Sequence, residues 1–180
     1  GDGDGSDGSQ HGYEVQLVLE FCDVGSLREN LDAGAFVDDV GLNYVAVLET
    51  AADIAKGMAH LHAHGVLHSD LKAANVMLKS GGSDGRGCIA KLVDFGLAIT
   101  LDAQSDQTHV SQMFHGTITH MAPEVLMEGK QSKAADVYAF GVTLWELYTG
   151  QKPYKGVPRV VLGHKIVFEE QRPSFPADVP

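Results

Sequence analysis

The sequence predicts an α+β domain that is mainly helical. Two long helical segments, residues 42–63 and 133–148, are accompanied only by a few short strand-like runs. The chain has 180 residues, of which 44% are hydrophobic. That length fits one domain of ordinary size, and that composition is sufficient to bury a core.

The first expected elements follow a polar lead-in. Residues 1–12 are rich in glycine and aspartate and contain no aliphatic residue, so we expect a flexible, solvated lead-in. Residues 15–21 are mostly apolar, which predicts a buried strand. Ser26 and Glu29 then have the spacing of a capping box, which predicts a short helix that begins at Ser26.

A long helix is expected over residues 42–63, because apolar residues recur there at three- and four-residue spacing, and Gly65 is expected to end it. The recurring positions are Val45, Leu48, Ala52, Ala55 and Ala59, with Met58 and Leu61. Beyond this helix, residues 76–79 and 89–93 are strand-like. They enclose a polar run, which predicts a hairpin with an expanded loop at residues 80–87.

The second long helix is expected over residues 133–148, capped by Ser132 and stopped by Gly150. Its apolar positions run all round the helix, which predicts the central buried helix of the domain. The apolar run over residues 137–148 is interrupted by Glu146. It is also shorter than the about 20 residues that a helix needs to cross a bilayer, so we expect no membrane segment in this chain.

Charge and cysteine content exclude several classes of protein. With 13 basic and 24 acidic residues the formal charge is −11, whereas nucleic-acid binding depends on lysine and arginine that neutralise phosphates. The two cysteines, Cys22 and Cys88, are too few for a disulfide scaffold, which favours a reducing compartment. The acidic, glycine-rich start does not resemble a signal peptide. We therefore expect a cytoplasmic protein that binds no nucleic acid.

Three short motifs carry the chemistry of the sequence. They are HSDLKAAN at residues 68–75, DFG at residues 94–96 and APE at residues 122–124. The first places an aspartate, a lysine and an asparagine on one loop, and the second adds another carboxylate. Oxygen ligands hold Mg²⁺, a lysine neutralises a moving phosphoryl group, and a carboxylate can accept the proton of an attacking hydroxyl. This inventory of side chains indicates phosphoryl transfer.

In this order and spacing, the motifs closely resemble the large, C-terminal lobe of eukaryotic protein kinases. The resemblance implies a partial kinase domain over residues 13–180, from the hinge strand through the segment after the central helix. It implies a protein-kinase-like large lobe with a remnant of the small-lobe sheet, incomplete at both ends. The glycine-rich phosphate loop and the strand lysine of the small lobe are not found before residue 15, so we expect the chain alone to have little or no kinase activity.

The resemblance assigns roles at the site of phosphoryl transfer. It implies Asp70 as the catalytic base, Lys72 on the γ-phosphate, and Asn75 and Asp94 as ligands of magnesium, so that Asp70, Lys72 and Asn75 form the catalytic set. The implied cofactors are ATP and Mg²⁺.

For adenine, the resemblance implies Leu19 as gatekeeper, the backbone of Glu20 and Cys22 at the hinge, and Met77 as the floor beneath the ring. ATP contacts are thereby expected at Leu19, Glu20, Cys22, Lys72, Asn75, Met77 and Asp94.

Two further implications concern the support of this site. The rings of His68 and Phe95 are expected to stack in an apolar spine. Asp136, an acid within the second long helix, is expected to bond the backbone of the loop at residues 68–75, which would explain an otherwise costly buried carboxylate.

The substrate class and subgroup follow from the same resemblance. Lys72 and a Thr117 that lies near the base are similar to kinases that transfer the ATP γ-phosphate to serine or threonine of a protein. The runs AAN at residues 73–75 and DVYAFG at residues 136–141 are most similar to the tyrosine kinase-like group, the Raf-like and MAP kinase kinase kinase-like enzymes. The alternative function is a pseudokinase-like scaffold that binds partners without catalysis. Retention of all four polar residues of the site favours the enzyme.

The chain departs from the family where a phosphate is usually clamped. Ser69 stands where many kinases have arginine, and no lysine or arginine occurs between Leu92 and Gly129. We therefore expect activation not to depend on a phosphate docked locally at Thr100, Ser105, Thr108 or Ser111. His120 stands where tyrosine is common, and the sequence gives no physical reason for that change.

Overall fold

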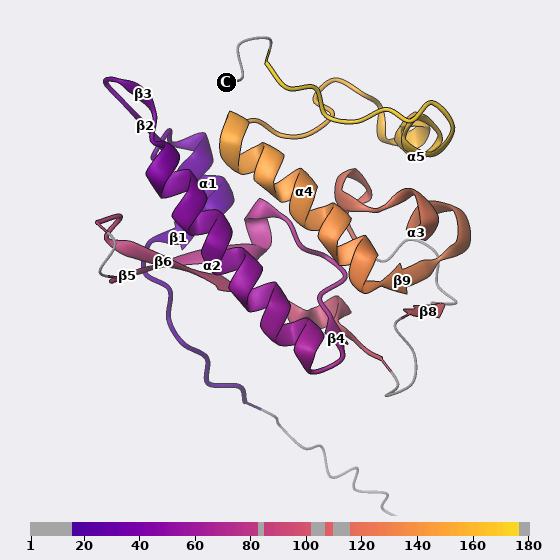
Figure 1. Ribbon diagram of the computed structural model, residues 1–180, viewed down its shortest axis with the longest axis horizontal. Helices are drawn as coiled ribbons and strands as arrows, with labels where there is room; N and C mark the ends of the chain where they lie inside the picture. Colours follow the sequence, from indigo (N-terminus) through magenta and orange to yellow (C-terminus); the bar gives the residue numbers. More distant parts are fainter. Residues whose placement is uncertain (1–15, 83–84, 102–106, 110–115, 177–180) are drawn as a thin grey trace, which may run out of the picture.

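The computed structural model describes residues 16–82, 85–101, 107–109 and 116–176. Two long helices, α2 (Tyr44–Ala63) and α4 (Lys133–Thr149), lie side by side, and small sheets and short helices surround them (Figure 1). The mainly helical α+β architecture predicted from the sequence is therefore confirmed for the described residues.

The remaining elements are short. The helices are α1 (Leu27–Asp32), α3 (Pro123–Glu128) and α5 (Arg159–Phe168), with 3₁₀ turns η1 (Ala73–Asn75), η2 (Phe95–Leu97) and η3 (Ile118–His120). An antiparallel sheet has the order β1-β5-β6 and consists of Gly25–Ser26, Val76–Ser80 and Cys88–Leu92. Three further antiparallel pairs are β2–β3 (Val37–Asp38 with Gly41–Leu42), β4–β7 (Val66–Leu67 with Ile99–Thr100) and β8–β9 (Gln107–His109 with Lys130–Ser132).

Local sequence signals placed several element ends correctly. Ser26 is the N-cap of α1, and its side chain and that of Glu29 form the predicted capping box. Ser132 caps α4, whose end at Gly150 has a φ of 68°, a left-handed conformation that glycine adopts without strain. Strands β5 and β6 form the predicted hairpin, of whose loop residues 83–84 lie outside the described residues.

The spacing predicted helix α2 correctly but did not determine which side of it is buried. Val45 and Leu48 are 63% and 66% exposed, whereas the buried positions are Val47, Thr50, Ile54 and Met58. Both sets have three- and four-residue spacing, so the period alone could not choose between them. Met58 belongs to both sets. The other recurring positions include three alanines, whereas Ile54 buries a larger apolar side chain, which favours turning its side toward the core.

Helix α4 is central, as predicted, but it is not buried on all sides. Its buried residues include two acids, Asp136 and Glu146, which are 2% and 4% exposed. Val137 is 60% exposed, so one side of the helix lies at the surface. The side of α4 that faces the interior carries apolar residues such as Val142 and Leu147 together with the two acids. These two acids anchor the candidate site.

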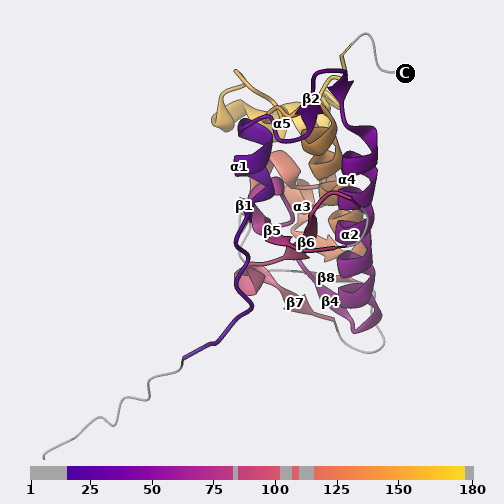
Figure 2. The ribbon, with the colours of Figure 1, turned by 90° about the vertical axis from the view of Figure 1, so that its left-hand side faces the viewer.

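The predicted buried strand at residues 15–21 is wrong. Residue 15 lies outside the described residues, and residues 16–21 have no regular secondary structure. The segment extends away from the helical body (Figure 2), and Leu17, Val18 and Phe21 are at least 80% exposed. Within the described residues no strand pairs with this segment, so its β-type composition alone does not make a strand. The predicted lead-in, residues 1–12, lies outside the described residues.

The core lies beneath the β5–β6 hairpin and between the two long helices. Its members come from elements on both sides of the loop at residues 68–75; they include Leu27, Leu31, Ile54, Met58, Leu71, Ala73, Val76, Leu78, Ala139 and Leu147. Leu71 and Ala73 belong to that loop and are fully buried. The core therefore holds the loop that carries the polar residues of the site.

Candidate active site

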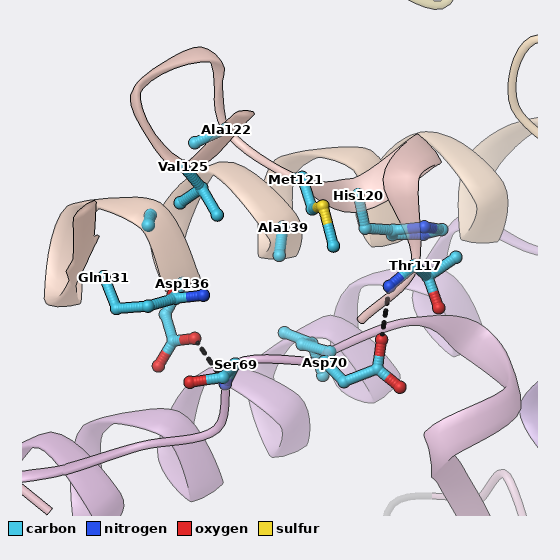
Figure 3. A pocket seen from close by; sticks show the side chains of 12 residues that line it. Ser69, Asp70, Thr117, His120, Met121, Ala122, Val125, Gln131, Asp136 and Ala139 are labelled. Atoms are coloured by element: carbon cyan, nitrogen blue, oxygen red, sulfur yellow. Dashed lines mark hydrogen bonds between the residues drawn. The ribbon is translucent and has the colours of Figure 1, made fainter. Parts of the chain in front are cut away.

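The loop at residues 68–75, hereafter the catalytic loop, connects β4 to β5 and is fastened by Asp136 of α4. The carboxylate of Asp136 accepts hydrogen bonds from the backbone N–H groups of His68 and Ser69, both at 2.9 Å. Its Oδ2 also lies 2.8 Å from Nε2 of His62. Figure 3 shows the bond to Ser69. The predicted bond between Asp136 and this backbone is confirmed. Ser69 has a φ of 64°, an uncommon conformation for a residue with a Cβ, which these bonds help to hold.

Asp70 is buried, and its carboxylate is surrounded by donors. Oδ1 accepts a hydrogen bond from the backbone N–H of Thr117 at 2.9 Å (Figure 3), and Oδ2 lies 2.7 Å from Nζ of Lys72 and 3.0 Å from Nδ2 of Asn75. Burial acts to raise the pKa of Asp70, but the hydrogen bonds from Lys72 and Thr117 and the lysine charge outweigh it. The pKa of this carboxyl therefore lies below its ordinary value, and the group is a carboxylate at neutral pH.

Lys72 connects the catalytic loop to the segment that precedes α3. Its Nζ lies 2.7 Å from Asp70 Oδ2 and donates to Oγ1 of Thr117, also at 2.7 Å. Thr117 comes directly before the 3₁₀ turn η3. The prediction that Thr117 lies near Asp70 is confirmed, and the ammonium group of Lys72 bridges the two segments.

Asn75 is oriented by its two hydrogen bonds to Asp70. Its Nδ2 donates to the backbone oxygen of Asp70 at 2.9 Å and to Oδ2 at 3.0 Å. Both partners are acceptors, so the amide nitrogen must face them, and the oxygen Oδ1 lies on the other side of the amide. An amide oxygen held in this way is of the kind that Mg²⁺ takes as a ligand.

Asp94 is placed beside Asn75 by the β5–β6 hairpin. The backbone N–H of Val93 donates to the oxygen of Asn75 at 3.0 Å, and Asp94 is the next residue along the chain. Asp94 is exposed and has a φ of 63°, and its Oδ1 accepts from the N–H of Gly96 at 3.4 Å. The structure thus brings the ends of the catalytic loop and of β6 together, with an amide on one and a carboxylate on the other.

The ring of Phe95 lies against that of His68. Their centroids are 5.5 Å apart at an angle of 46°, and Nε2 of His68 lies 3.2 Å from the backbone oxygen of Val93. His68 is fully buried, whereas Phe95 is half exposed. The predicted contact between these two rings is confirmed.

The residues predicted to contact adenine are not held together by mutual contacts as the residues around Asp70 are. Leu19 is 80% exposed, and Cys22 is partly buried. Glu20 binds the hairpin through Lys79 at 2.6 Å and Lys91 at 3.3 Å, while Met77 pairs with Lys91 within the sheet. The ion pairs bring the segment around Glu20 to the edge of the β1-β5-β6 sheet, but Leu19 does not pack against it.

A small cavity lies behind Asp70, between the catalytic loop and the segment that leads into α3 (Figure 3). Its volume of ≈ 20 Å³ is enough for about one water molecule. Ser69 borders it, and its buried Oγ has no hydrogen-bond partner among the described residues. Ser69 therefore contributes an unsatisfied hydroxyl to the edge of this cavity.

Sequence reasoning missed a second cluster, which contains Glu146 and His120. Oε2 of Glu146 lies 3.0 Å from Nε2 of His120 and accepts a hydrogen bond from the backbone N–H of Ala73, also at 3.0 Å. Oε1 lies 3.3 Å from Nη1 of Arg28. The available signal was an acid within an apolar helix, the same signal that pointed to Asp136. The contact also gives the substitution at His120 a physical reason, because the imidazole pairs with a buried acid.

Among the described residues, none of the helices is both long enough and apolar enough to span a membrane. In the same part of the chain, no group of three or more histidine, cysteine, aspartate or glutamate side chains is arranged to hold a metal ion.

Comparisons with known proteins show the family of this chain. The family described as protein tyrosine and serine/threonine kinase matches residues 8–180. The chain is 33% identical over 161 residues to the serine/threonine/tyrosine-protein kinase HT1 of Arabidopsis thaliana, covering 89% of the chain and 38% of that protein. It is 38% identical over 141 residues to mitogen-activated protein kinase kinase kinase 13-B of Xenopus laevis, covering 78% and 13%.

A third relative, mitogen-activated protein kinase kinase kinase 12 of Rattus norvegicus, is 37% identical over 141 residues, covering 78% of the chain and 14% of the relative. The chain thus spans well under half of the length of each of these relatives. The match to the family extends over nearly all of the chain and includes the catalytic loop, the DFG motif and the APE motif. On these grounds the chain belongs to the protein kinase family, with relatives among the Raf-like and MAP kinase kinase kinase-like enzymes.

Proposed function

We propose that this chain is the catalytic lobe of an ATP-dependent protein serine/threonine kinase. The observation that carries the proposal is the state of Asp70, a buried carboxylate kept deprotonated by Lys72, Thr117 and Asn75. A base at this position needs a fixed orientation and an ionised oxygen, and the contacts of Asp70 supply both.

In the proposed reaction, Asp70 accepts the proton of a serine or threonine hydroxyl of the protein substrate. The hydroxyl oxygen forms a new bond to the γ-phosphorus of ATP, the bond from that phosphorus to the β–γ bridging oxygen breaks, and ADP leaves with the electron pair. Lys72 offers its positive charge to the transferring phosphoryl group. Its two hydrogen bonds hold the ammonium beside both the base and Thr117.

The residues present fit a magnesium site. The oxygen of Asn75 is turned away from Asp70, and the exposed Asp94 carboxylate follows the residue that bonds to the Asn75 backbone. We infer that these two oxygen donors hold Mg²⁺, which neutralises phosphate charge when it is bound with ATP. Their hard oxygen chemistry and their small number suit a metal that keeps water and phosphate ligands.

We place adenine at the segment of Leu19, Glu20 and Cys22, with Met77 beneath the ring. The ion pairs of Glu20 with Lys79 and Lys91 support this placement, because they tie that segment to the strand that carries Met77. Leu19 is exposed and contributes to a gatekeeper site only if another element covers it. Binding of ATP at this edge leads its phosphates toward Asn75 and Asp94, where β5 begins and β6 ends.

The expectation that activation does not depend on a local phosphate stays a prediction. Ser105 and Ser111 lie outside the described residues. Thr108 lies in β8, which pairs with β9. This pairing supports the prediction, because backbone hydrogen bonds rather than a phosphate then hold the segment around Thr108. We further propose the cytoplasm as the compartment, from the cysteine content alone.

The proposed function is tested by phosphoryl transfer from radiolabelled Mg–ATP with the full-length protein. We expect label on a mixed protein acceptor, recovered as phosphoserine or phosphothreonine after acid hydrolysis, because Lys72 and Thr117 flank the base. Omission of Mg²⁺ serves as the control and is expected to remove the signal. Label recovered only as phosphotyrosine would contradict the serine/threonine assignment. Mg–ATP binding without any transfer would favour the pseudokinase-like scaffold.

A further inference from the structure

The side chain of Glu146 connects three elements that are distant in the sequence. It lies on α4, is 4% exposed, and bonds to His120 of η3, to the N–H of Ala73 in the catalytic loop and to Arg28 of α1. A buried carboxylate is costly unless donors satisfy it, and here each oxygen has at least one. None of these residues has a role in the chemistry described above.

The partners of Glu146 belong to the two segments that meet at Lys72. Ala73 is the residue directly after Lys72, and His120 lies three residues after Thr117. Lys72 and Thr117 are themselves hydrogen-bonded. One carboxylate oxygen, Oε2, therefore ties together the same two segments that the lysine bridges on the side of the catalytic base.

The orientation of the imidazole is fixed from both of its nitrogens. Nε2 of His120 faces Glu146, and Nδ1 lies 2.9 Å from Oγ1 of Thr119. Arg28 is likewise held by the backbone oxygens of Gly150 and Gln151, at 2.6 and 3.1 Å. The cluster is thus anchored at both ends, and Glu146 is its shared acceptor.

Helix α4 holds the catalytic loop on both sides of the catalytic residues. Asp136 binds the backbone just before Asp70, at His68 and Ser69, and Glu146 binds it just after Lys72, at Ala73. Two acids on one rigid helix are therefore spaced to fix a three-residue stretch of loop.

Glu146 is suited to holding the loop and not to proton transfer. Burial acts to raise the pKa of this carboxyl, but the hydrogen bond and charge of His120, the N–H of Ala73 and the charge of Arg28 outweigh it. The pKa of Glu146 is therefore lowered, and the group is a permanent anion at neutral pH. All three of its contacts are with donors, whose hydrogen bonds a carboxylate accepts.

We propose that Glu146 and His120 are positioning residues that set the register of the catalytic loop against the segment at residues 117–122, and through it the contact of Lys72 with Thr117. The proposal rests on the kinase function proposed above. It assigns a role to the histidine that replaces the common tyrosine, which is to supply the donor that links this segment to the buried acid.

A matched pair of variants at His120 tests the proposal in the full-length protein. His120→Leu keeps the size and removes the donor, whereas His120→Gln keeps an N–H donor near the position of Nε2. We expect kcat for His120→Leu to fall about tenfold or more, the effect of losing one hydrogen bond to a charged group. The KM for Mg–ATP is expected to stay within about twofold, and His120→Gln is expected to recover most of kcat.

Hydrogen exchange gives a readout that needs no activity. The N–H of Ala73 is bound to Glu146, and that of Ser69 is bound to Asp136. In His120→Leu we expect the Ala73 amide to exchange faster while the Ser69 amide keeps its wild-type rate. In His120→Gln both rates should match the wild type. The Ser69 amide is thus an internal control against general loosening of the loop.

The outcomes separate this proposal from the proposed function. A wild-type protein that transfers phosphate and needs Asp70, with His120→Leu equally active, would overturn the positioning role and leave the kinase function standing. Faster exchange of both amides together, without recovery in His120→Gln, would also overturn it, because His120 would then serve only general stability. If the wild type shows no transfer, the kinase function fails, and the Ala73 exchange rate alone decides whether His120 governs the loop.

Discussion

Replacing Asp70 with Asn is expected to lower kcat of the full-length protein by at least about 10²-fold, the loss typical of removing a general base. The amide has the shape of the carboxylate and can still accept the hydrogen bond from the Thr117 N–H. It cannot take the proton of the substrate hydroxyl. Nucleotide binding should persist, because the proposed ATP contacts at the hinge and at Asn75 and Asp94 remain.

The measurement for Asp70→Asn pairs a steady-state phosphotransfer assay with titration of Mg–ATP. Asp38→Asn is the matched control, because Asp38 is the exposed last residue of β2 and its carboxylate accepts hydrogen bonds from the neighbouring N–H groups of Val40 and Gly41. We expect its kcat to equal that of the wild type. An Asp70→Asn protein with more than about one third of the wild-type kcat would show that Asp70 is not the base.

Replacing Asp136 with Ala is expected to lower the free energy of unfolding by about 3–5 kcal/mol. The substitution leaves the buried N–H group of His68 and the partly buried N–H group of Ser69 without an acceptor and removes the partner of His62. The loss is a large part of the 5–15 kcal/mol that ordinary domains have.

The measurement for Asp136→Ala is urea unfolding followed by circular dichroism. Val137→Ala is a control on the same helix, and because Val137 is 60% exposed its cost should stay within about 0.5 kcal/mol. A urea midpoint for Asp136→Ala equal to that of the wild type would contradict the view that this acid holds the catalytic loop in place.

The elements predicted correctly from the sequence are those fixed by nearby residues. The capping box at Ser26, the β5–β6 hairpin and the ends of α4 depend on contacts within a few positions. The buried face of α2 depends on what packs against the helix, and two stripes of equal spacing were available. Residues 16–21 are not a strand in the described structure, because strand formation requires a partner that the local composition cannot supply.

The same distinction applies to the site. The order of the motifs pointed to Asp70, Lys72, Asn75 and Asp94, and the structure places the first three in one hydrogen-bonded group. The role of Glu146 was not found, because its contacts with His120 and Ala73 join residues 26 and 73 positions apart. A buried acid can be recognised in a sequence as a residue that needs partners, but the partners themselves are set by the tertiary fold.

The most direct test of the account is a crystal structure of the full-length protein with Mg²⁺, a non-hydrolysable ATP analogue and a serine peptide. We predict that the amide oxygen of Asn75 and the carboxylate of Asp94 ligate the metal. We also predict the Asp70 carboxylate within hydrogen-bond reach of the serine hydroxyl, at about 2.6–3.2 Å. A metal and triphosphate bound elsewhere, with Asp70 and Asp94 directed to separate surfaces, would contradict the assignment of this chain as a catalytic lobe.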